Sequence, residues 1–367
     1  HHASIYAWGV QNEITITSEN EALIEGIKEL NAYAKLLDSS RPTTCAQFTM
    51  CGLDSELNRV TDILAYNHYF GWYMKTGLDE WLEKFHAANP DLKMGISEYG
   101  AEGVLGYFND APFQGDYSEG YQALYHEHYI KSINANKWIW GSYVWNMFDF
   151  GSAIRNEGGV KGRNNKGLVT FDRKTKKDSF WLYKAFWSDD KFVHLVGDRY
   201  PLRKIGTQTF KVYSNCDKVQ IKVNNKQKTV TAEGIFVFED MEIKAGENKI
   251  TVTAGDIKEI YIITGVEEYP REYSLPDGAK SMVRNWFVER DSTKRDDCYS
   301  LDDTIGDLLK SEDILGMVGG AAGKLLKSPL MLAVKPFSLR QLLNLPIVNL
   351  DSSMVEMIED YLGTISK

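Results

Sequence analysis

The fold class of this chain is decided by residues 5–13, which read IYAWGVQNE. The run from Ile5 to Val10 is mostly apolar or aromatic, and it stops on the amide of Asn12 and the carboxylate of Glu13. A buried strand that ends on such groups is typical of a parallel β/α sheet, which presents catalytic side chains at its rim. The segment therefore predicts a core strand with functional groups at its carboxyl end.

Residues 1–190 alternate short apolar segments with amphipathic ones, the pattern of β/α units around a parallel sheet. We predict strands at 5–11, 43–48, 63–68, 93–97 and 139–145, and helices after Ser18 and over 78–88, 118–135 and 179–186. Ser18 and Glu21 form a capping-box pattern at the start of the first helix. Five strands are too few to close an eight-stranded barrel, so we expect only part of a larger β/α unit.

The pattern changes near Lys191 to alternating strands without helices. The strands are expected at 192–196, 209–213, 219–223, 235–238, 249–253 and 259–263. This spacing predicts an immunoglobulin-like β-sandwich over 191–268. Residues 269–367 read as a polar linker followed by a small helical module, because Leu and Ile recur there at helical spacing.

The composition of the 367 residues restricts the possible partners. A net charge of −9 argues against nucleic acid or an anionic membrane, both of which favour basic patches. The four cysteines are scattered without metal-site spacing, so neither a metal site nor a disulfide framework is expected. No apolar run approaches the length of a membrane helix. A neutral or mildly charged small ligand is the expected partner.

Two carboxylates, Glu13 and Glu98, lie at the ends of predicted strands. Acids at such places face the rim where sites are built, whereas most acids of this chain lie on helix faces. Glycoside hydrolysis uses a pair of carboxyl groups, one to protonate the leaving oxygen and the other to attack or to activate water. Aromatic residues, among them Tyr69 and Trp145 near strand ends, suit the apolar faces of sugar rings. The residues alone thus indicate a site that acts on a sugar.

Five motifs carry a family resemblance: AWGVQNE (7–13), NHYFGWY (67–73), GISEYGAE (95–102), YVWNMFDF (143–150) and GRNNKGLVTFDRKTKKDSFWLYKAFW (162–187). Together they resemble the second half of the catalytic barrel of family 2 glycoside hydrolases, the family of β-galactosidases and β-glucuronidases. The resemblance covers residues 1–190 and implies an α/β fold containing strands 4 to 8 of a (β/α)8 TIM barrel. The family's immunoglobulin-like domains after the barrel agree with the sandwich at 191–268.

The resemblance implies roles for the two carboxylates. Glu13 would be the general acid/base, and Glu98 would be the nucleophile of a retaining double displacement. Carboxyl groups of a retaining pair lie about 5–5.5 Å apart. Glu13 must be protonated at rest, so we expect its pKa to be raised by partial burial and by the charge of Glu98.

The resemblance also implies a set of substrate-binding residues. Asn12 would hold the sugar 2-hydroxyl, and Tyr69 would donate a hydrogen bond to the Glu98 carboxylate. Trp145 would form part of the sugar platform, and Tyr73 is counted with the substrate-binding residues.

The sugar is predicted with an alternative. Asn164 and Lys166 match an Asn-x-Lys element with which β-glucuronidases grip the substrate carboxylate, and a Lys ammonium suits that task. The glucuronidase pattern would also have Arg where this chain has Val160. The phrase GGVKGRNNKGLVTFDR (158–173) also resembles members assigned as β-galactosidases. The expected activity is hydrolysis of terminal β-D-galactosides, with β-glucuronides as the alternative.

An alternative hypothesis is that the chain by itself is a sugar-binding or structural fragment and does not turn over substrate. Half of a barrel exposes sheet edges and an apolar face, so we expect association with a missing N-terminal half or a homo-oligomer. The substrate partner would be a β-linked glycoside or oligosaccharide. No cofactor and no metal ligand are predicted, with Mg²⁺ left open, and the expected location is the bacterial cytoplasm.

Overall fold

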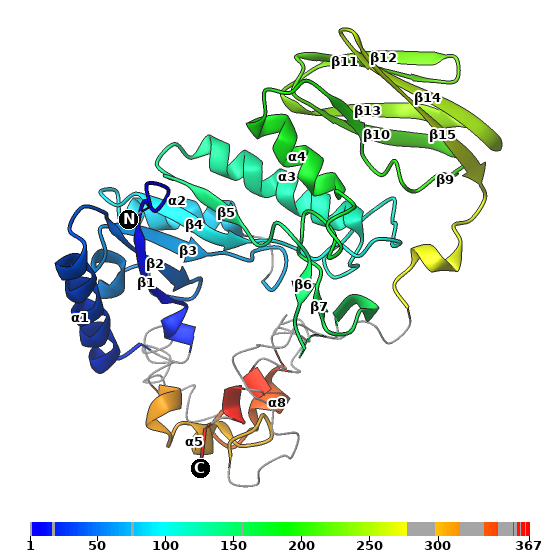
Figure 1. Cartoon of the computed structure of the whole chain (residues 1–367). Helices are drawn as coiled ribbons and strands as arrows, with labels where there is room; N and C mark the ends of the chain where they lie inside the picture. Colours follow the sequence, from blue (N-terminus) through cyan, green and yellow to red (C-terminus); the bar gives the residue numbers. More distant parts are fainter. Residues whose placement is uncertain are drawn as a thin grey trace. The chain divides into compact units, whose positions relative to one another are not determined.

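The structure is a computed structural model of the chain (Figure 1). It describes residues 2–16, 19–74, 77–153, 155, 157–276, 298–315, 334–343, 355, 358–359, 361–363 and 365–367. Two units are distinguished. The first comprises His1–Tyr99, Ala135–Tyr143 and Met282–Lys367, and the second comprises Gly100–Asn134 and Val144–Ser281.

The first unit is built on a five-stranded sheet whose order follows the sequence. Its strands are β1 (Trp8–Asn12), β2 (Thr43–Phe48), β3 (Ile63–Asn67), β4 (Met94–Tyr99) and β5 (Ser142–Val144). The pairs β1–β2, β2–β3 and β3–β4 are parallel, as β/α units require. All five predicted strands are confirmed, and β2 has the predicted bounds.

Two helices belong to this sheet. α1 (Glu21–Leu37) contacts β1 and β2. α2 (Leu78–Ala88) packs on β3, where the ring of Trp81 lies 4.8 Å from that of Tyr66. The capping prediction for α1 is wrong: Asn20 is the N-cap, and its side chain accepts a hydrogen bond from the backbone N–H of Leu23. Asn is a strong N-cap residue, and Ser18 lies outside the described residues.

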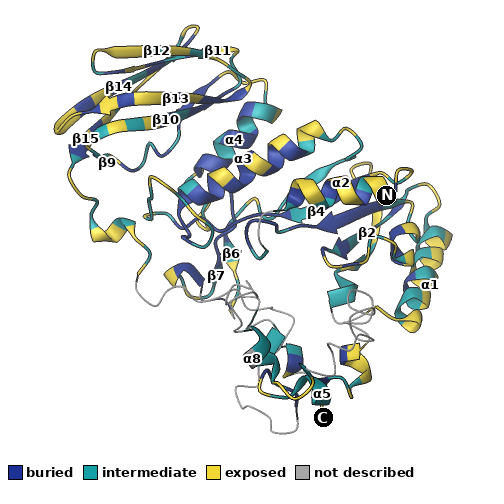
Figure 2. Cartoon of the chain, turned by 180° about the vertical axis from the view of Figure 1, so that it is seen from behind, coloured by how far each residue is buried: buried dark blue, intermediate teal, exposed yellow. Residues whose placement is uncertain are grey.

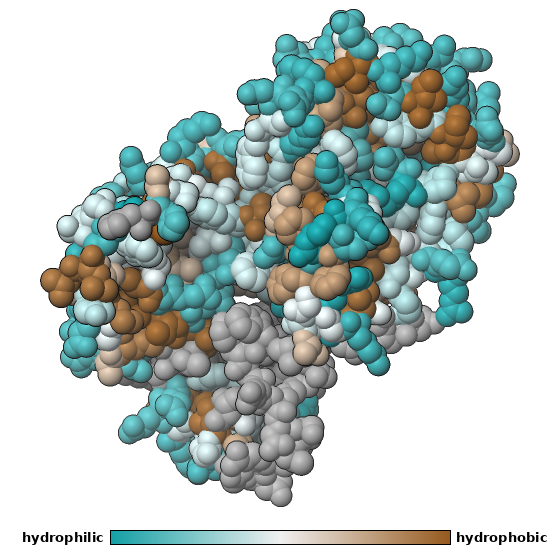
Figure 3. Space-filling view, in the orientation of Figure 1, coloured by the Kyte–Doolittle hydropathy of each residue, from teal (hydrophilic) through white to brown (hydrophobic). Residues whose placement is uncertain are grey.

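Burial concentrates in the middle of the sheet (Figure 2). Tyr66 in β3 and Ile96 in β4 are fully buried, whereas the edge strand β1 is half-buried to exposed. Figure 3 shows apolar side chains gathered over α1, and the exposed large apolar residues of this helix are Leu30, Leu36 and Leu37. The apolar face that the sequence predicted belongs to an open half-barrel over residues 1–190, and it stays a prediction.

The second unit contains α3 (Glu119–Ala135), α4 (Asp178–Trp187) and the short antiparallel pair β6 (Phe150–Gly151) and β7 (Arg163–Asn164). Both helices agree with the predictions to within a residue at each end. The described 3-10 helices of the chain are η1 (Ile14–Ile16), η2 (Glu56–Arg59), η3 (Glu157–Gly159) and η4 (Arg271–Tyr273).

Two further sheets of this unit form a sandwich. One has the order β13-β10-β8 and the other β12-β11-β14-β15-β9. The strands are β8 (Val193–Leu195), β9 (Leu202–Lys204), β10 (Gly206–Ser214), β11 (Lys218–Val223), β12 (Lys226–Thr231), β13 (Gly234–Ile243), β14 (Gly246–Ala254) and β15 (Ile257–Val266). Side chains from both sheets, such as Val212 and Val252, share one buried core. The six predicted strands are confirmed and β9 and β12 are additional, while an immunoglobulin-like topology stays a prediction.

Polar contacts tie the sandwich to the helices of the same unit. The Glu127 carboxylate of α3 accepts hydrogen bonds from the Tyr213 hydroxyl at 2.6 Å and the Lys211 ammonium at 2.7 Å. α4 also contacts β10 and β13. The helices and the sandwich therefore share an interface with buried polar bonds.

The C-terminal region is described only in parts. These include the short helices α5 (Ile305–Leu308) and α8 (Leu339–Leu343) and an apolar cluster that contains Leu301, Leu308 and Leu362. Helices were predicted in this region, and much of their sequence lies outside the described residues. Across the described ranges, no helix combines the length and apolar character that membrane crossing requires.

Candidate active site

The first predicted catalytic residue follows directly after β1. Glu13 has a φ of 51°, in the left-handed region that side chains other than Gly seldom adopt. Its backbone N–H donates to the carbonyl of Ala46 at 2.8 Å, and the β1–β2 register shifts between Gly9 and Asn12. The strand alternation is therefore broken where the Asn12 and Glu13 side chains leave the sheet.

Asn67, the last residue of β3, connects these groups to the neighbouring strands. Its side-chain Nδ2 donates to Oδ1 of Asn12 at 3.2 Å and to Oε1 of Glu13 at 3.0 Å. Its Oδ1 accepts a hydrogen bond from the hydroxyl of Ser97 in β4 at 2.7 Å. One buried amide thus joins the carboxyl ends of β1, β3 and β4.

Glu98, the second predicted catalytic residue, lies near the end of β4. The Tyr69 hydroxyl donates to its Oε2 at 2.7 Å, as expected from the sequence. Burial first, and then the negative charge of Glu98, hold the pKa of Tyr69 well above its usual value, so Tyr69 stays protonated and donates. The ring of Tyr73 lies 4.8 Å from that of Tyr69. The structure therefore brings Tyr69, Tyr73 and Glu98 together.

Glu13 and Glu98 have different surroundings. Burial raises the pKa of Glu13 above its ordinary 4.5, and the hydrogen bond from Asn67 opposes that shift. The charge of Glu98, which was also expected to raise this pKa, is not among the causes of the shift. A half-buried carboxyl with a raised pKa is suited to proton donation.

Lys166 and Asn164 belong to the second unit, in a cluster of buried charges. The Lys166 backbone N–H donates to Oδ1 of Asn164 at 3.0 Å, so the predicted Asn-x-Lys element forms a local turn. The Lys166 ammonium lies 3.4 Å from Oε1 of Glu102, and the Arg155 guanidinium lies 3.1 Å from the same oxygen. These two cations share one carboxylate oxygen. Burial opposes their effect on the pKa of Glu102, which is nevertheless lowered.

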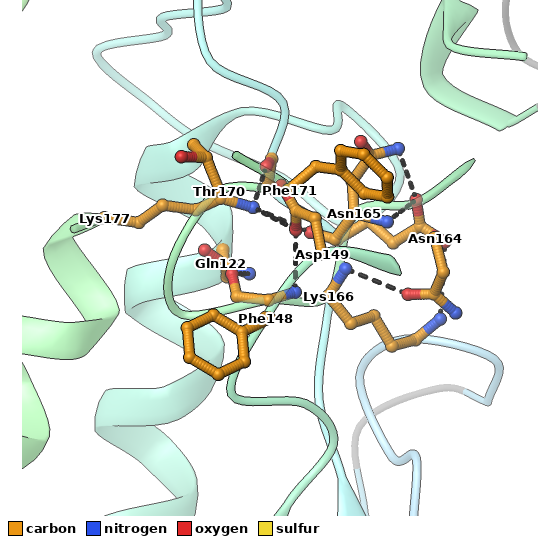
Figure 4. Close-up of polar contacts among 12 residues, drawn as sticks. Gln122, Phe148, Asp149, Asn164, Asn165, Lys166, Thr170, Phe171 and Lys177 are labelled. Atoms are coloured by element: carbon orange, nitrogen blue, oxygen red, sulfur yellow. Dashed lines mark hydrogen bonds and ion pairs between the residues drawn. The ribbon is translucent and has the colours of Figure 1, made fainter. Parts of the chain in front are cut away.

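A neighbouring network holds the backbone around Lys166 (Figure 4). The buried Lys177 ammonium donates to Oδ1 of Asp149 at 2.8 Å, to the Gly103 carbonyl at 2.7 Å and to the Asn165 carbonyl at 3.0 Å. Asp149 Oδ1 also accepts from the N–H of Gly167 at 2.9 Å. A Cβ on Gly167 would stand 1.9 Å from the Asp149 backbone nitrogen, so only Gly fits there.

We expect Lys177→Met to destabilise the protein by about 3–5 kcal/mol, because it leaves the Asp149 carboxylate buried without its cation. The measurement is the free energy of unfolding in urea. Lys174→Met is the matched control, since Lys174 is exposed three residues away, and it should change that free energy by less than about 0.5 kcal/mol. Equal stability of the two variants would contradict the role given to the Lys177–Asp149 pair.

Trp145, the predicted sugar platform, also lies in the second unit. Its ring meets that of Phe150 edge to face at 5.7 Å, and the Trp145–Asn146 peptide bond is cis. A Cβ on Gly100 would stand 2.0 Å from the Trp145 carbonyl oxygen, so the motif glycine allows the two backbones to meet. The platform role of Trp145 stays a prediction.

A group with metal-ligand chemistry occurs at Asp178, His194 and Asp198. His194 Nε2 is hydrogen-bonded to Asp178 Oδ1 at 2.7 Å, and the Gly197 N–H donates to Asp178 Oδ2 at 2.9 Å. Each oxygen of the Asp178 carboxylate is therefore already hydrogen-bonded within the protein. The cluster therefore ties α4 to β8 and the following turn, and we assign it no metal.

Sequence reasoning missed several residues of both clusters, namely Asn67, Ser97, Glu102, Asp149, Arg155 and Lys177. Asn67 and Ser97 carried a usable signal, because each lies within two residues of a predicted site residue at a strand end. The Lys177–Asp149 and Arg155–Glu102 pairs join residues 28 and 53 positions apart, and no local pattern identifies such partners.

Known proteins similar to this chain are glycosidases. A β-glucuronidase of Bacteroides fragilis is 40% identical over 264 residues, which are 69% of this chain and 37% of that protein. The solved structure of an FMN-binding β-glucuronidase from Facaelibacterium prausnitzii L2-6 is 46% identical, has a TM-score of 0.72, and is matched over 75% of this chain and 43% of its own. A candidate β-galactosidase from Bacteroides fragilis is 32% identical with a TM-score of 0.66, over 74% of this chain and 42% of its own.

This chain thus spans about two fifths of the length of these relatives. The model of the glycosyl hydrolases family 2 TIM barrel domain matches residues 1–191, more than half of the chain. The matched region contains β1 to β5 together with the Glu13, Glu98 and Lys166 clusters. The chain therefore belongs to glycosyl hydrolase family 2.

Proposed function

We propose that this chain carries the catalytic carboxylates of a retaining β-glucuronidase, with Glu13 as general acid/base and Glu98 as nucleophile. The observation that carries the proposal is the pair of strand-end carboxylates: Glu13 is half-buried with a raised pKa, and Glu98 accepts a hydrogen bond from Tyr69. This difference between the two groups matches an acid beside an ionised nucleophile.

The reaction proceeds in two displacements. Glu98 attacks the anomeric carbon while Glu13 gives its proton to the departing glycosidic oxygen, which leaves a glycosyl ester on Glu98 and an ionised Glu13. Glu13 then takes a proton from water, the water oxygen attacks the anomeric carbon, and the ester bond to Glu98 breaks. The sugar leaves with its original configuration, and both carboxyl groups return to their starting protonation.

The other residues at these strand ends hold the sugar and the nucleophile. Tyr69 keeps Glu98 oriented through its hydroxyl. Asn12 binds the sugar 2-hydroxyl, whose hydrogen bond strengthens in the transition state. Tyr73 and Trp145 contribute aromatic surface to the sugar site.

A glucuronide is favoured over a galactoside. The sequence placed galactosides first, and that choice has less support than its alternative, because the β-glucuronidase relatives are more similar than the candidate β-galactosidase. The charges of the second unit also suit an anion. The Lys166 and Arg155 cations lie beside one oxygen of Glu102, and an ammonium or guanidinium can pair with a substrate carboxylate.

The direct test compares 4-nitrophenyl β-glucuronide, β-galactoside and β-glucoside as substrates of the intact protein. We expect the glucuronide to have the highest kcat/KM. A preference for the galactoside would instead restore the choice made from the sequence. No turnover of any of the three by a folded protein would favour a sugar-binding or structural role.

Lys166→Gln is expected to lower kcat/KM for the glucuronide by roughly 10²-fold relative to the glucoside, because only the glucuronide has a carboxylate to pair with the ammonium. The ratio of the two kcat/KM values is the measurement. Lys161→Gln is the control, since Lys161 is exposed near the same motif, and it should leave that ratio unchanged. An equal loss on both substrates would assign Lys166 to folding through Glu102 alone.

A further inference from the structure

Asn67 is a buried residue at the end of β3 whose side-chain amide is hydrogen-bonded to residues of two other strand ends. Its side chain is 1% exposed. Its backbone carbonyl is already occupied by the hydroxyl of Thr49, at 2.5 Å. The side-chain amide makes separate hydrogen bonds to Asn12, Glu13 and Ser97.

The orientation of this amide is determined from both ends. The NH₂ group meets Oε1 of Glu13, which can accept whether or not the other carboxyl oxygen, Oε2, carries the proton. The Ser97 hydroxyl donates to the Oδ1 on the other side. A flip of the amide would turn Oδ1 toward the oxygens of Asn12 and Glu13 and lose the two bonds that the NH₂ group donates there. The Ser97 hydroxyl, on the strand that also carries Glu98, supports the observed orientation by donating to Oδ1.

We propose that Asn67 is a positioning residue for the acid/base, holding Glu13 and Asn12 in register with the strand that bears the nucleophile. The proposal rests on the proposed function. Strand register agrees with this role, because Asn67 pairs with Glu98 across the β3–β4 ladder, and the N–H of His68 donates to the Glu98 carbonyl at 2.8 Å. The two catalytic residues are thus connected through the side chain and the backbone of one strand end.

The hydrogen bonds of Asn67 determine which atoms of Glu13 and Asn12 remain available to the substrate. The Asn67 bond occupies Oε1 of Glu13, so Oε2 is the oxygen that carries the proton toward the glycosidic oxygen. Asn12 accepts through Oδ1, and its own NH₂ is then directed to the sugar 2-hydroxyl. Two further titratable groups lie at these strand ends, namely Tyr69 and Glu98, and the Tyr69 hydroxyl donates to the Glu98 carboxylate.

The test measures Asn67→Leu in the intact protein with glucuronides of good and poor leaving groups. Phenyl glucuronide depends on protonation of its leaving group, and 2,4-dinitrophenyl glucuronide does not. We expect roughly a 10²-fold loss of kcat/KM for the phenyl substrate, the scale of a misplaced catalytic group, and a much smaller loss for the dinitrophenyl one. The alkaline limb of the pH profile should move to higher pH, because the ionised form of Glu13 loses a donor.

Two further variants keep the test sharp. Asn67→Asp replaces the donor with a second negative charge, so the alkaline limb should move further in the same direction than in Asn67→Leu. Ser97→Ala leaves Asn67 in place but removes the hydroxyl that aligns it. It should show the same leaving-group dependence with a smaller loss, and it serves if Asn67→Leu fails to fold.

Asn58→Leu is the matched control. Asn58 is also buried, at 2% exposure, but its side chain bonds to the Gly52 and Leu53 carbonyls and to the Tyr66 hydroxyl. It should lower the Tm without moving the pH limb or the leaving-group dependence.

Folded Asn67 and Ser97 variants that lose activity equally on both substrates, with an unmoved limb, would overturn the proposal and leave Asn67 a structural amide. Glu13→Gln, measured alongside, distinguishes a failure of the proposed function from a failure of the role proposed for Asn67. Full activity of Glu13→Gln would overturn the proposed function and this inference together, whereas an inactive Glu13→Gln with a normal Asn67→Leu would overturn this inference alone.

Discussion

Glu98→Gln is expected to abolish glycoside hydrolysis by the intact protein, with a loss of at least about 10⁴-fold in kcat, the scale on which a covalent catalyst contributes. The amide retains the shape of the side chain and can still accept from Tyr69, but it cannot form the glycosyl ester. The loss should therefore be equal for good and poor leaving groups. The measurement is kcat for phenyl and 2,4-dinitrophenyl glucuronide.

Glu83→Gln is the control for this change. Glu83 is exposed on α2, and the same Glu-to-Gln replacement there should leave kcat and the Tm unchanged. Substantial residual turnover by purified Glu98→Gln would contradict the assignment of Glu98, and it would move the nucleophile to another carboxylate.

Glu13→Ala is expected to lower kcat/KM by about 10²- to 10⁴-fold for phenyl glucuronide, the usual contribution of a general acid, and much less for 2,4-dinitrophenyl glucuronide. The dinitrophenolate leaves without a proton, so only the second displacement, in which Glu13 acts as base, remains impaired. Azide needs no general base. Added azide should therefore restore turnover of the dinitrophenyl substrate in Glu13→Ala and yield the β-glycosyl azide.

The same residue sets the pH dependence. Because burial raises the pKa of Glu13, the proton donor persists above the ordinary 4.5, and kcat/KM should fall only as pH rises through the raised value. The sign for stability is the same, since the protonated folded form is favoured below the unfolded pKa and this contribution is lost as pH rises through the folded one. The alkaline limb should be absent from the residual activity of Glu13→Gln. A limb that persists there would assign it to another group.

The regular parts of this fold could be predicted because their patterns are local. Residues 43–48 and 78–88 have the predicted bounds, since alternation and helical spacing are complete within each segment. β12 was missed because its sequence, KQKTVT, is polar and lies at a sheet edge. The α1 cap was misplaced because the Ser18–Glu21 spacing matches a capping box, while Asn20, an equally good cap, stands directly before the first helical residue.

The candidate site was predictable only in part for a related reason. Glu13, Tyr69 and Glu98 lie at strand ends, and a parallel sheet brings such ends to one edge, so their proximity follows from the pattern. The role of Asn67 depends on the register of β3 against β4 and, through β2, against β1, and sequence spacing does not give that register. Lys166 was expected to face a substrate carboxylate. The structure adds that Lys166 is buried beside Glu102, a residue that the Asn-x-Lys element does not include.

The most direct test of the central claim is to locate the covalent intermediate. A 2-deoxy-2-fluoro-β-glucuronyl fluoride slows the second displacement, so the intact protein should accumulate one glucuronyl ester, which peptide mass spectrometry can assign to a residue. We expect an adduct on Glu98, formed at a normal rate in Lys161→Gln and absent in Glu98→Gln. An adduct on any other residue, or a label that persists in Glu98→Gln, would contradict it.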